Sequence, residues 1–186
     1  MGRWVSEGRA DGELAEEARA GDHTAFAALV TRYQQAIGGY LFRLTGDREV
    51  AFDLAQETFV RAYRALGHTR PGLQFKPWLY RIATNLAYDH LRRRRRIAWV
   101  SLHGIDRVVH ADPPGSVEER DLVQQTLAHL RPDERAVLLL CGLEELSYPE
   151  AAAMLGGSAE AIRKRFTRAK EHFRRVYAAL DEVVMP

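Results

Sequence analysis

Helical spacing of apolar residues runs through most of the chain, and this feature excludes most folds. Apolar residues recur at intervals of three and four between Gly12 and Leu44, at Leu14, Ala18, Phe26, Leu29, Val30, Tyr33, Ile37, Tyr40, Leu41 and Leu44. That spacing is typical of amphipathic helices, and the strict alternation of half-buried β-strands is nearly absent. The pattern therefore predicts an all-α fold.

One interruption is long enough to divide the chain. The helical spacing fails from Trp99 to Val117, and the run Asp112–Ser116 (DPPGS) has the composition of a linker. We expect two small helical domains joined by a flexible linker, because 186 residues suffice for two such units. The predicted parts are a disordered N-terminal extension (1–11), a first domain (12–98), the linker (99–117) and a second domain (118–186).

Turn and capping residues place the helices of the first domain. Asp22 is a plausible N-cap, and Gly46-Asp47 breaks the pattern. A helix then carries one apolar face, made of Phe52, Ala55, Phe59, Tyr63 and Leu66. Residues 67–74 are expected to form a loop, and Pro77 suits the first turn of a helix that ends near Arg94.

The second domain has the pattern of a helix-turn-helix. Helices are expected from about Glu118 to Leu130, from near Pro132, and in two further stretches that Ser147 and Ser158 cap. Gly156-Gly157 separates the last two helices, as the short turn of a helix-turn-helix requires. The final helix buries one stripe, composed of Ile162, Phe166, Ala169, Phe173, Tyr177 and Leu180.

The remaining faces of this last helix are basic. Residues 159–176 hold seven basic side chains against Glu160 and Glu171. Arg and Lys on a helix in the major groove can reach guanine edges and phosphates. The pattern favours DNA binding, and the alternative is a solvated basic face without a ligand.

A second basic stretch lies at Phe75–Arg96 (FKPWLYRIATNLAYDHLRRRRR). On a helix, one apolar stripe (Phe75, Leu79, Ile82, Leu86) separates from a mixed stripe of Trp78, Arg81, Asn85, Tyr88/Asp89 and Arg92. Aromatic rings stack on unpaired bases, amides bind base edges and arginines hold phosphates, so the mixed stripe suits single-stranded nucleic acid. The alternative is that Trp78 belongs to the core and that Arg92–Arg96 is an ordinary solvated run.

The charge is sorted along the chain. Residues 1–57 carry six basic and ten acidic groups, whereas residues 58–117 carry eleven and three, a net charge of +8. The basic middle is therefore a candidate polyanion site. The helix 52–66 presents Asp53, Gln56 and Glu57 opposite its predicted apolar face, which by pattern alone is an ordinary wet surface.

Three segments in this order resemble the bacterial RNA polymerase sigma factors of the sigma-70 family. They are DLAQETFVRAYRAL (Asp53–Leu66), PWLYRIATNLAYDHLRR (Pro77–Arg93) and LRPDERAVLLLCGLEELSYPEAAAMLGGSAEAIRKRFTRAK (Leu130–Lys170). Within that family, the chain resembles the extracytoplasmic-function (ECF) group, which retains only domains two and four. The resemblance covers about residues 12–96 and 118–178.

The resemblance implies a role for each part. Domain two would bind the coiled coil of the polymerase beta-prime subunit through Asp53, Gln56 and Glu57, and domain four would meet the beta flap. The minus-10 and melting residues would be Trp78, Arg81, Asn85, Tyr88, Arg92 and Arg93, with Asn85 in a pocket for a flipped base shaped by the loop Thr69–Lys76. The minus-35 element would be read by Arg163, Lys164, Thr167 and Arg168, although the family often has a small residue at Lys164.

Partners and excluded classes complete the prediction. The resemblance implies core RNA polymerase, promoter DNA and an anti-sigma factor that wedges between the domains. A two-domain regulator that binds duplex DNA without polymerase is the alternative. We expect no enzyme and no cofactor, since Cys141 lies in an apolar run and the linker histidines His103 and His110 lack helical support for a metal site. A cytoplasmic protein is expected, because no apolar run approaches about 20 residues.

Overall fold

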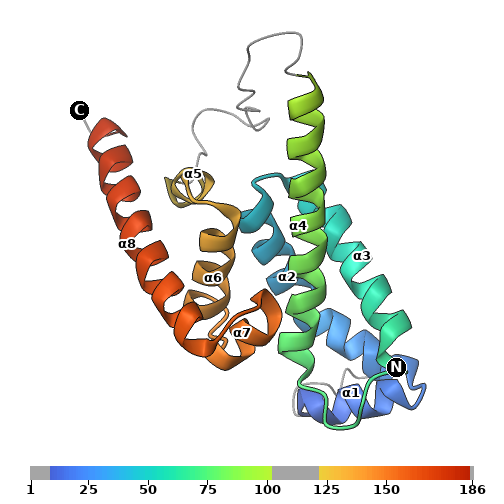
Figure 1. Ribbon diagram of the computed structural model, residues 1–186. Helices are drawn as coiled ribbons and strands as arrows, with labels where there is room; N and C mark the ends of the chain where they lie inside the picture. Colours follow the sequence, from blue (N-terminus) through green and yellow to red (C-terminus); the bar gives the residue numbers. More distant parts are fainter. Residues whose placement is uncertain (1–8, 102–121, 185–186) are drawn as a thin grey trace.

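The computed structural model describes residues 9–101 and 122–184, and every regular element in these two ranges is an α-helix (Figure 1). The first range holds α1 (Asp11–Arg19), α2 (His23–Thr45), α3 (Arg48–Leu66) and α4 (Phe75–Ser101). The second range holds α5 (Leu122–His129), α6 (Pro132–Gly142), α7 (Tyr148–Leu155) and α8 (Ala159–Val184). We call α1–α4 the N-terminal lobe and α5–α8 the C-terminal lobe. The all-α prediction is confirmed, and most of the expected linker (99–117) lies outside the described residues.

Capping residues lie at the helix ends where the sequence predicts them. Asp22 accepts hydrogen bonds from two first-turn backbone N–H groups of α2, at 2.7 and 3.2 Å. Gly46 follows α2 in the left-handed region (φ 80°), which glycine adopts without strain. Ser147 and Glu150 satisfy each other's backbone N–H groups at 2.8 and 3.4 Å, and Ser158 Oγ accepts one at 3.1 Å. These caps confirm the predicted helix-turn-helix outline.

Helix α4 is longer than predicted. The sequence pattern ended it near Arg94, whereas the helix continues through the arginine run to Ser101. Arginine is a good helix former, and the first Gly beyond the run is Gly104, so nothing in the chain stops the helix earlier. The basic run therefore projects from the N-terminal lobe on a helix.

Helix α3 buries only part of the predicted apolar face. Phe52 and Tyr63, both expected inside, are 65% and 48% exposed. Leu66 is buried, and Ala55 and Phe59 pack half-buried against the core, as predicted. The other buried positions are the small residues Ala51, Thr58 and Ala62. Because α3 contacts both α2 and α4, small side chains let the three helix backbones approach, and Phe52 and Tyr63 remain exposed.

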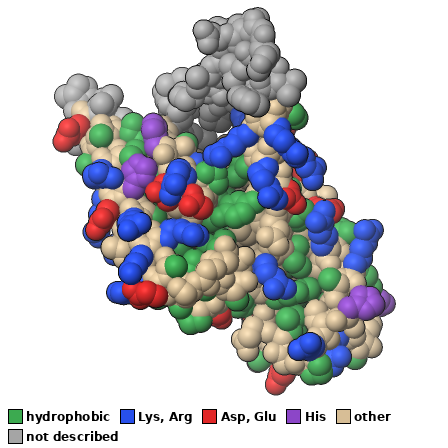
Figure 2. All heavy atoms as spheres, in the orientation of Figure 1, with side chains coloured by type: hydrophobic (Ala, Val, Ile, Leu, Met, Phe, Trp, Pro, Cys, Tyr) green, Lys and Arg blue, Asp and Glu red, His purple; other side chains and the backbone are tan. Residues whose placement is uncertain are grey.

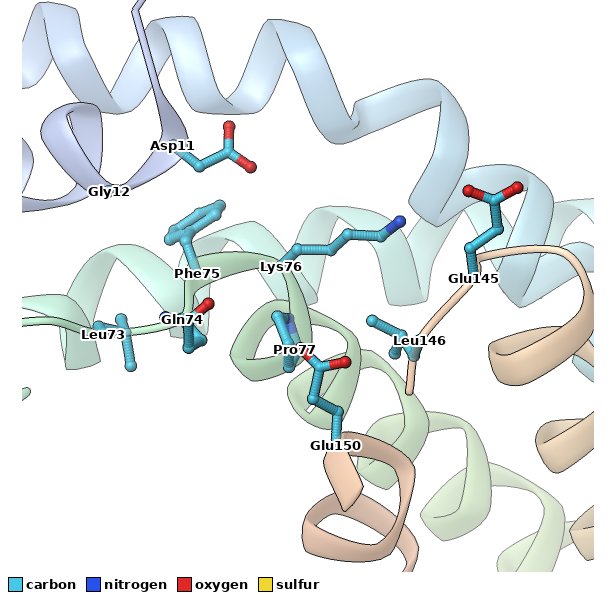
Figure 3. Close-up of a pocket in the computed structure, with 10 residues that line it drawn as sticks. All are labelled: Asp11, Gly12, Leu73, Gln74, Phe75, Lys76, Pro77, Glu145, Leu146 and Glu150. Atoms are coloured by element: carbon cyan, nitrogen blue, oxygen red, sulfur yellow. The ribbon is translucent and has the colours of Figure 1, made fainter. Parts of the chain in front are cut away.

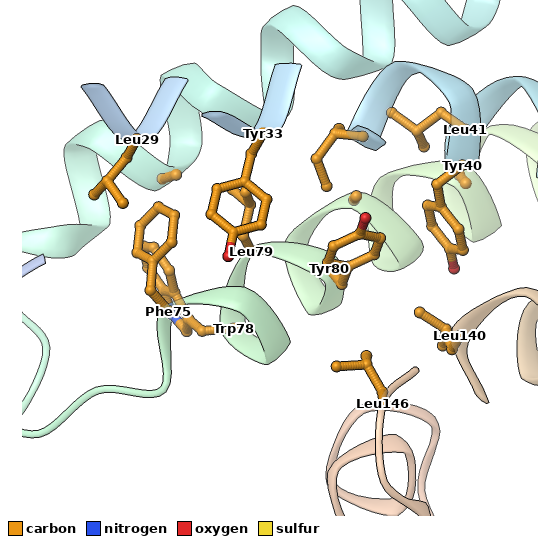
Figure 4. Packing of buried hydrophobic residues seen from close by; sticks show 14 of the residues in the cluster. Leu29, Tyr33, Tyr40, Leu41, Phe75, Trp78, Leu79, Tyr80, Leu140 and Leu146 are labelled. Carbon is orange, nitrogen blue, oxygen red and sulfur yellow. The ribbon is translucent and has the colours of Figure 1, made fainter. Parts of the chain in front are cut away.

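The two lobes pack directly against each other. Helices α2 and α4 contact α5, α6 and α7, and one continuous core cluster contains buried residues of both lobes. Figure 4 shows Tyr40 and Tyr80 of the N-terminal lobe facing Leu140 and Leu146 of the C-terminal lobe. None of the helices in the described residues is both long and apolar enough to span a membrane.

Candidate nucleic-acid interface

The outer face of α4 presents Arg81 and Asn85 to solvent. The helix is held from behind, since the buried Thr84 hydroxyl lies 2.7 Å from the Tyr40 hydroxyl and donates to the Tyr80 carbonyl at 2.7 Å. A buried anchor beside two exposed polar side chains fixes the direction in which those side chains project. The structure thus brings Arg81 and Asn85 together on one accessible face, as the mixed stripe predicts.

The arginine run extends this face. All five side chains of Arg92–Arg96 are exposed. Arg92 forms an ion pair with Asp89, and this hydrogen bond is the main cause of the lowered pKa of the Asp89 carboxyl. Arg93 adds to the lowering by its charge, and within the described ranges it makes no ion pair that would compete with a phosphate. Four arginines of the run are therefore available to an anion, and Arg92 is shared with Asp89.

Two of the predicted contact residues lie deeper. The Trp78 side chain is only 9% exposed and packs against the Phe75 ring with centroids 5.8 Å apart. Tyr88 is partly buried, and burial is the main cause that raises its pKa to about 12. In this conformation Trp78 is a core residue, which leaves base stacking to other groups.

The loop before α4 is tied to α1. Gly72 adopts φ 75° and donates its backbone N–H to Glu16 Oε1 at 2.8 Å. The same carboxylate binds Arg19 at 2.6 Å, and these hydrogen bonds, with that to Arg19 the largest, lower the pKa of Glu16. The loop is thereby anchored at its turn, just before the start of α4. Sequence reasoning missed Glu16, because nothing in the local pattern links α1 to residue 72.

The exposed half of α8 carries the second basic face. Ile162 and Ala169 are fully buried, which turns the other sides of the helix outward. All four residues predicted to read the minus-35 element are exposed: Arg163, Lys164, Thr167 and Arg168. Figure 2 shows Lys and Arg side chains gathered along α8 and along α4 on the same side of the molecule.

An acidic residue accompanies this face. Glu160 accepts hydrogen bonds from Arg163 at 2.9 and 2.8 Å, and Lys164 Nζ lies 3.7 Å from the same carboxylate. The pKa of Glu160 is lowered, mainly by the Arg163 hydrogen bond. Arg168 makes no such ion pair in the described residues, so it is the guanidinium on this face that is free for a base or a phosphate.

A mixed acidic and apolar face lies on α3. Asp53 and Gln56 are exposed, and Glu57 is paired with Arg61 at 2.7 Å. Phe52 adjoins them, and with Asp53 it lines a shallow pocket at the start of the helix. An exposed aromatic ring beside carboxylates is typical of a protein-binding surface, where the ring supplies most of the affinity. Sequence reasoning assigned Phe52 to the core and missed its exposure.

The structure offers no sign of metal or thiol chemistry in the residues it describes. No group of three or more His, Cys, Asp or Glu side chains is placed to hold an ion within the two described ranges. His103 and His110 of the linker lie outside those ranges. Burial raises the pKa of the Cys141 thiol, which disfavours the nucleophilic thiolate.

Comparison with protein families matches both lobes. The family described as Sigma-70 region 2 matches residues 29–97, and Sigma-70 region 4 matches residues 120–173. The RNA polymerase sigma-H factor of Pseudomonas aeruginosa is 35% identical over 95% of this chain and 94% of its own length. The ECF RNA polymerase sigma-E factor of Escherichia coli is 32% identical over 98% of each chain.

Two solved structures share the fold. CnrH, in complex with the cytosolic domain of CnrY, superposes with a TM-score of 0.70 at 29% identity, covering 92% of this chain and 99% of CnrH. The sigma factor RpoE of Bartonella quintana, in complex with the anti-sigma factor NepR, gives a TM-score of 0.68 at 26% identity, covering 81% and 95%.

Proposed function

This chain belongs to the extracytoplasmic-function group of the sigma-70 family of RNA polymerase sigma factors, and we propose that its two basic helix faces read the two elements of a promoter. As a sigma factor it directs core RNA polymerase to promoters and promotes DNA melting. The observation that carries the proposal is the pair of exposed basic faces on α4 and α8, one in each lobe. Residues 12–98 would form domain two, 99–117 the linker and 118–186 domain four.

Domain two would melt the minus-10 element. Opening a duplex costs about 1.4 kcal/mol per base-pair step, and the protein must offset this by binding the separated strand. Asn85 supplies amide donors and acceptors for the edge of a flipped base, and Arg81 and Arg93 supply phosphate contacts. With Trp78 in the core, the walls of the base pocket would come from the anchored loop at 67–74.

Domain four would recognise the minus-35 element through α8. A helix fits the major groove, and Arg163, Lys164, Thr167 and Arg168 lie on the accessible half of the helix, away from the buried Ile162 stripe. Arg168 has no ion-pair partner among the residues that the structure describes and suits a guanine edge, since arginine binds its two acceptors together.

Polymerase would dock on the α3 face. Asp53, Gln56 and Glu57 would bind the beta-prime coiled coil, with Phe52 as an apolar anchor at the centre of the contact. The beta flap would meet domain four. The complexed relatives are bound by the cytosolic domain of CnrY and by the anti-sigma factor NepR, and an anti-sigma factor is proposed for this chain as well.

The remaining assignments follow from this role. A sigma factor supplies sequence choice and strand separation, and the polymerase performs the chemistry, so we assign no catalytic residue and no cofactor. Since promoters and polymerase lie in the cytoplasm of bacteria, this is the compartment we propose.

Transcription from a random promoter library with purified core polymerase tests the function and reads the promoter sequence together. We expect transcripts from a small class of templates that share two spaced elements. The matched test of the alternative is gel filtration with core polymerase. A regulator without sigma activity would bind duplex DNA alone and would not comigrate with the polymerase.

A further inference from the structure

The contact between the lobes contains a buried cation. Arg135 of α6 is only 7% exposed, and its Nη1 donates to the carbonyl of Leu44, at the end of α2 in the other lobe, at 2.7 Å. Its Nη2 donates to the carbonyls of Leu130 and Ala128 at 3.1 and 3.3 Å. Burial lowers the pKa of this guanidinium to about 10, so it remains charged at neutral pH. Arg135 thus caps the carbonyl end of α2, where a cation is favoured, from the other lobe.

A second cluster of polar contacts lies at the turn between α6 and α7. Tyr80 of α4 donates its hydroxyl to the Glu144 carboxylate, and Lys76 Nζ donates to the Glu144 carbonyl at 2.6 Å. Burial is the main cause that raises the pKa of Tyr80, and the hydrogen bond to Glu144 adds to it. The tyrosine therefore stays protonated and remains a donor. One residue of the C-terminal lobe is bound at two points by α4.

These contacts reach the promoter-reading part of the N-terminal lobe. A pocket of about 340 Å³ lies where the end of the loop before α4 meets the α6–α7 turn (Figure 3). Leu73, Gln74 and Lys76 line it from the N-terminal lobe, and Glu145 and Leu146 line it from the C-terminal lobe. The α6–α7 turn, which accepts a hydrogen bond from Lys76, therefore lies against the loop proposed to shape the base pocket.

With the lobes packed together, the two DNA-reading helices are too close to span both promoter elements. Elements centred at minus-35 and minus-10 lie about 25 base pairs apart, which is roughly 85 Å at about 3.4 Å per base pair. In the structure α4 contacts α7 and α7 contacts α8, so one short helix separates the two reading helices. The two reading helices therefore lie near each other, and both elements can be bound together only after the lobes part.

We propose that this chain is self-locked: Arg135 and Glu144 of the C-terminal lobe hold α2 and α4, and this closed form cannot initiate until the lobes separate. The role assigned to opening rests on the proposed function, whereas the lock itself is a property of the free chain. A partner that lies between the lobes would have to break these contacts, and one that binds across the outside of both would strengthen them.

The test removes single contacts across the lobes. Tyr80→Phe deletes the hydroxyl bound to Glu144 and keeps the buried ring. We expect the ratio of open to closed molecules to rise about tenfold, which corresponds to about 1.4 kcal/mol at 25 °C. Because the lock makes the open form the minor one, the chain concentration that half-saturates run-off transcription falls by the same factor. Arg135→Met acts in the same direction at the other contact, and the two changes combined should enlarge the radius of gyration in small-angle scattering.

Tyr33→Phe is the matched control. Tyr33 also donates its hydroxyl to a carboxylate, that of Asp11, but both residues lie in the N-terminal lobe. This variant should leave the radius of gyration and the half-saturating concentration unchanged. Circular dichroism melting shows whether the Arg135→Met lobe is folded, and Tyr80→Phe alone carries the test if it is not.

Three results would overturn the proposed lock. An unchanged half-saturating concentration for Tyr80→Phe, or an equal change in Tyr33→Phe, overturns it. So does a doubly substituted chain that stays folded and keeps the wild-type radius of gyration. If no chain, wild type included, supports transcription although the lobes open as expected, the proposed function fails and the lock stands.

Discussion

We expect the substitution Asn85→Ala to slow promoter opening while it stabilises the fold. Asn85 is exposed in the middle of α4, and its neighbours Thr84 and Leu86 are buried, so truncation leaves the core intact. Alanine is a better helix former than asparagine by about 0.5 kcal/mol, which predicts a small rise in the free energy of unfolding. An amide bound to a base edge is worth about 1–3 kcal/mol, so opening should fall by roughly 5- to 150-fold.

The assay separates opening from assembly. Permanganate reactivity of unpaired thymines reports opening by the assembled holoenzyme on a promoter selected from the library, and gel filtration reports binding to core polymerase. Gln34→Ala is the control, because Gln34 is an exposed amide on α2 with no proposed DNA contact. Opposite signs for stability and opening, with core binding unchanged, support a base-reading role. Equal losses in opening and core binding, or no loss in opening, would refute it.

Four further predictions follow from the exposed faces and caps. Arg168→Ala should relax sequence preference at the minus-35 element by about 1–3 kcal/mol in a competition binding assay, and unchanged preference would contradict the guanine contact. Neutralising Asp53 and Glu57 to the corresponding amides should weaken comigration with core polymerase and leave the melting temperature of the free chain unaltered. Affinity of the holoenzyme for DNA should fall steeply with salt, and Arg93→Gln should reduce the log–log slope by about 1 if Arg93 holds a phosphate. Ser147→Ala should lower the free energy of unfolding by about 1 kcal/mol in urea titrations, through loss of the α7 cap.

The last of these has a pH dependence with a defined sign. Hydrogen bonds from Ser147, the largest being that from its side chain, lower the pKa of Glu150 below its ordinary value. A carboxyl with a lowered pKa in the folded state stabilises the fold above its unfolded pKa, and this contribution is lost as the pH falls through the folded pKa. The difference in stability between wild type and Ser147→Ala should therefore narrow under acidic conditions. A difference that is constant from neutral to acidic pH would show that the carboxylate takes no part in the cap.

Local signals in the sequence were sufficient for most of the helices and for their caps, whereas the end of α4 was predicted too early. Asp22, Ser147 and Ser158 cap helices through atoms two or three residues away, and Gly46 takes a conformation that other residues avoid. Such interactions depend on neighbours in the sequence, so a single chain reveals them. The outward placement of Arg81, Asn85 and the α8 arginines followed from the same helical spacing.

The prediction of the buried face of α3 failed in part, because close packing of helices favours small side chains over large hydrophobic ones. On α3 the spacing of Ala51, Thr58 and Ala62 is as helical as that of Phe52, Phe59 and Tyr63, and the larger set was taken as the core. The contacts of α3 with α2 and α4 bury the smaller set fully and keep Phe59 half-buried against the core, whereas Tyr63 stays exposed. Phe52 is thereby left on the surface, beside the acidic residues proposed to bind polymerase.

Helix α4 shows why the contact between lobes escapes sequence reasoning. A helix that packs on one side buries one stripe of side chains. The sequence pattern therefore predicts a single buried stripe on α4. Tyr80, Thr84 and Ala87 are buried as well, because α4 contacts α2 and α3 on one side and α7 on another. The spacing of residues within α4 carries no information about a second partner more than 60 positions away, such as Glu144. The same contacts that broaden the buried arc of α4 form the proposed lock, so a chain that lost the lock should expose Tyr80 while its helices and caps stay as they are.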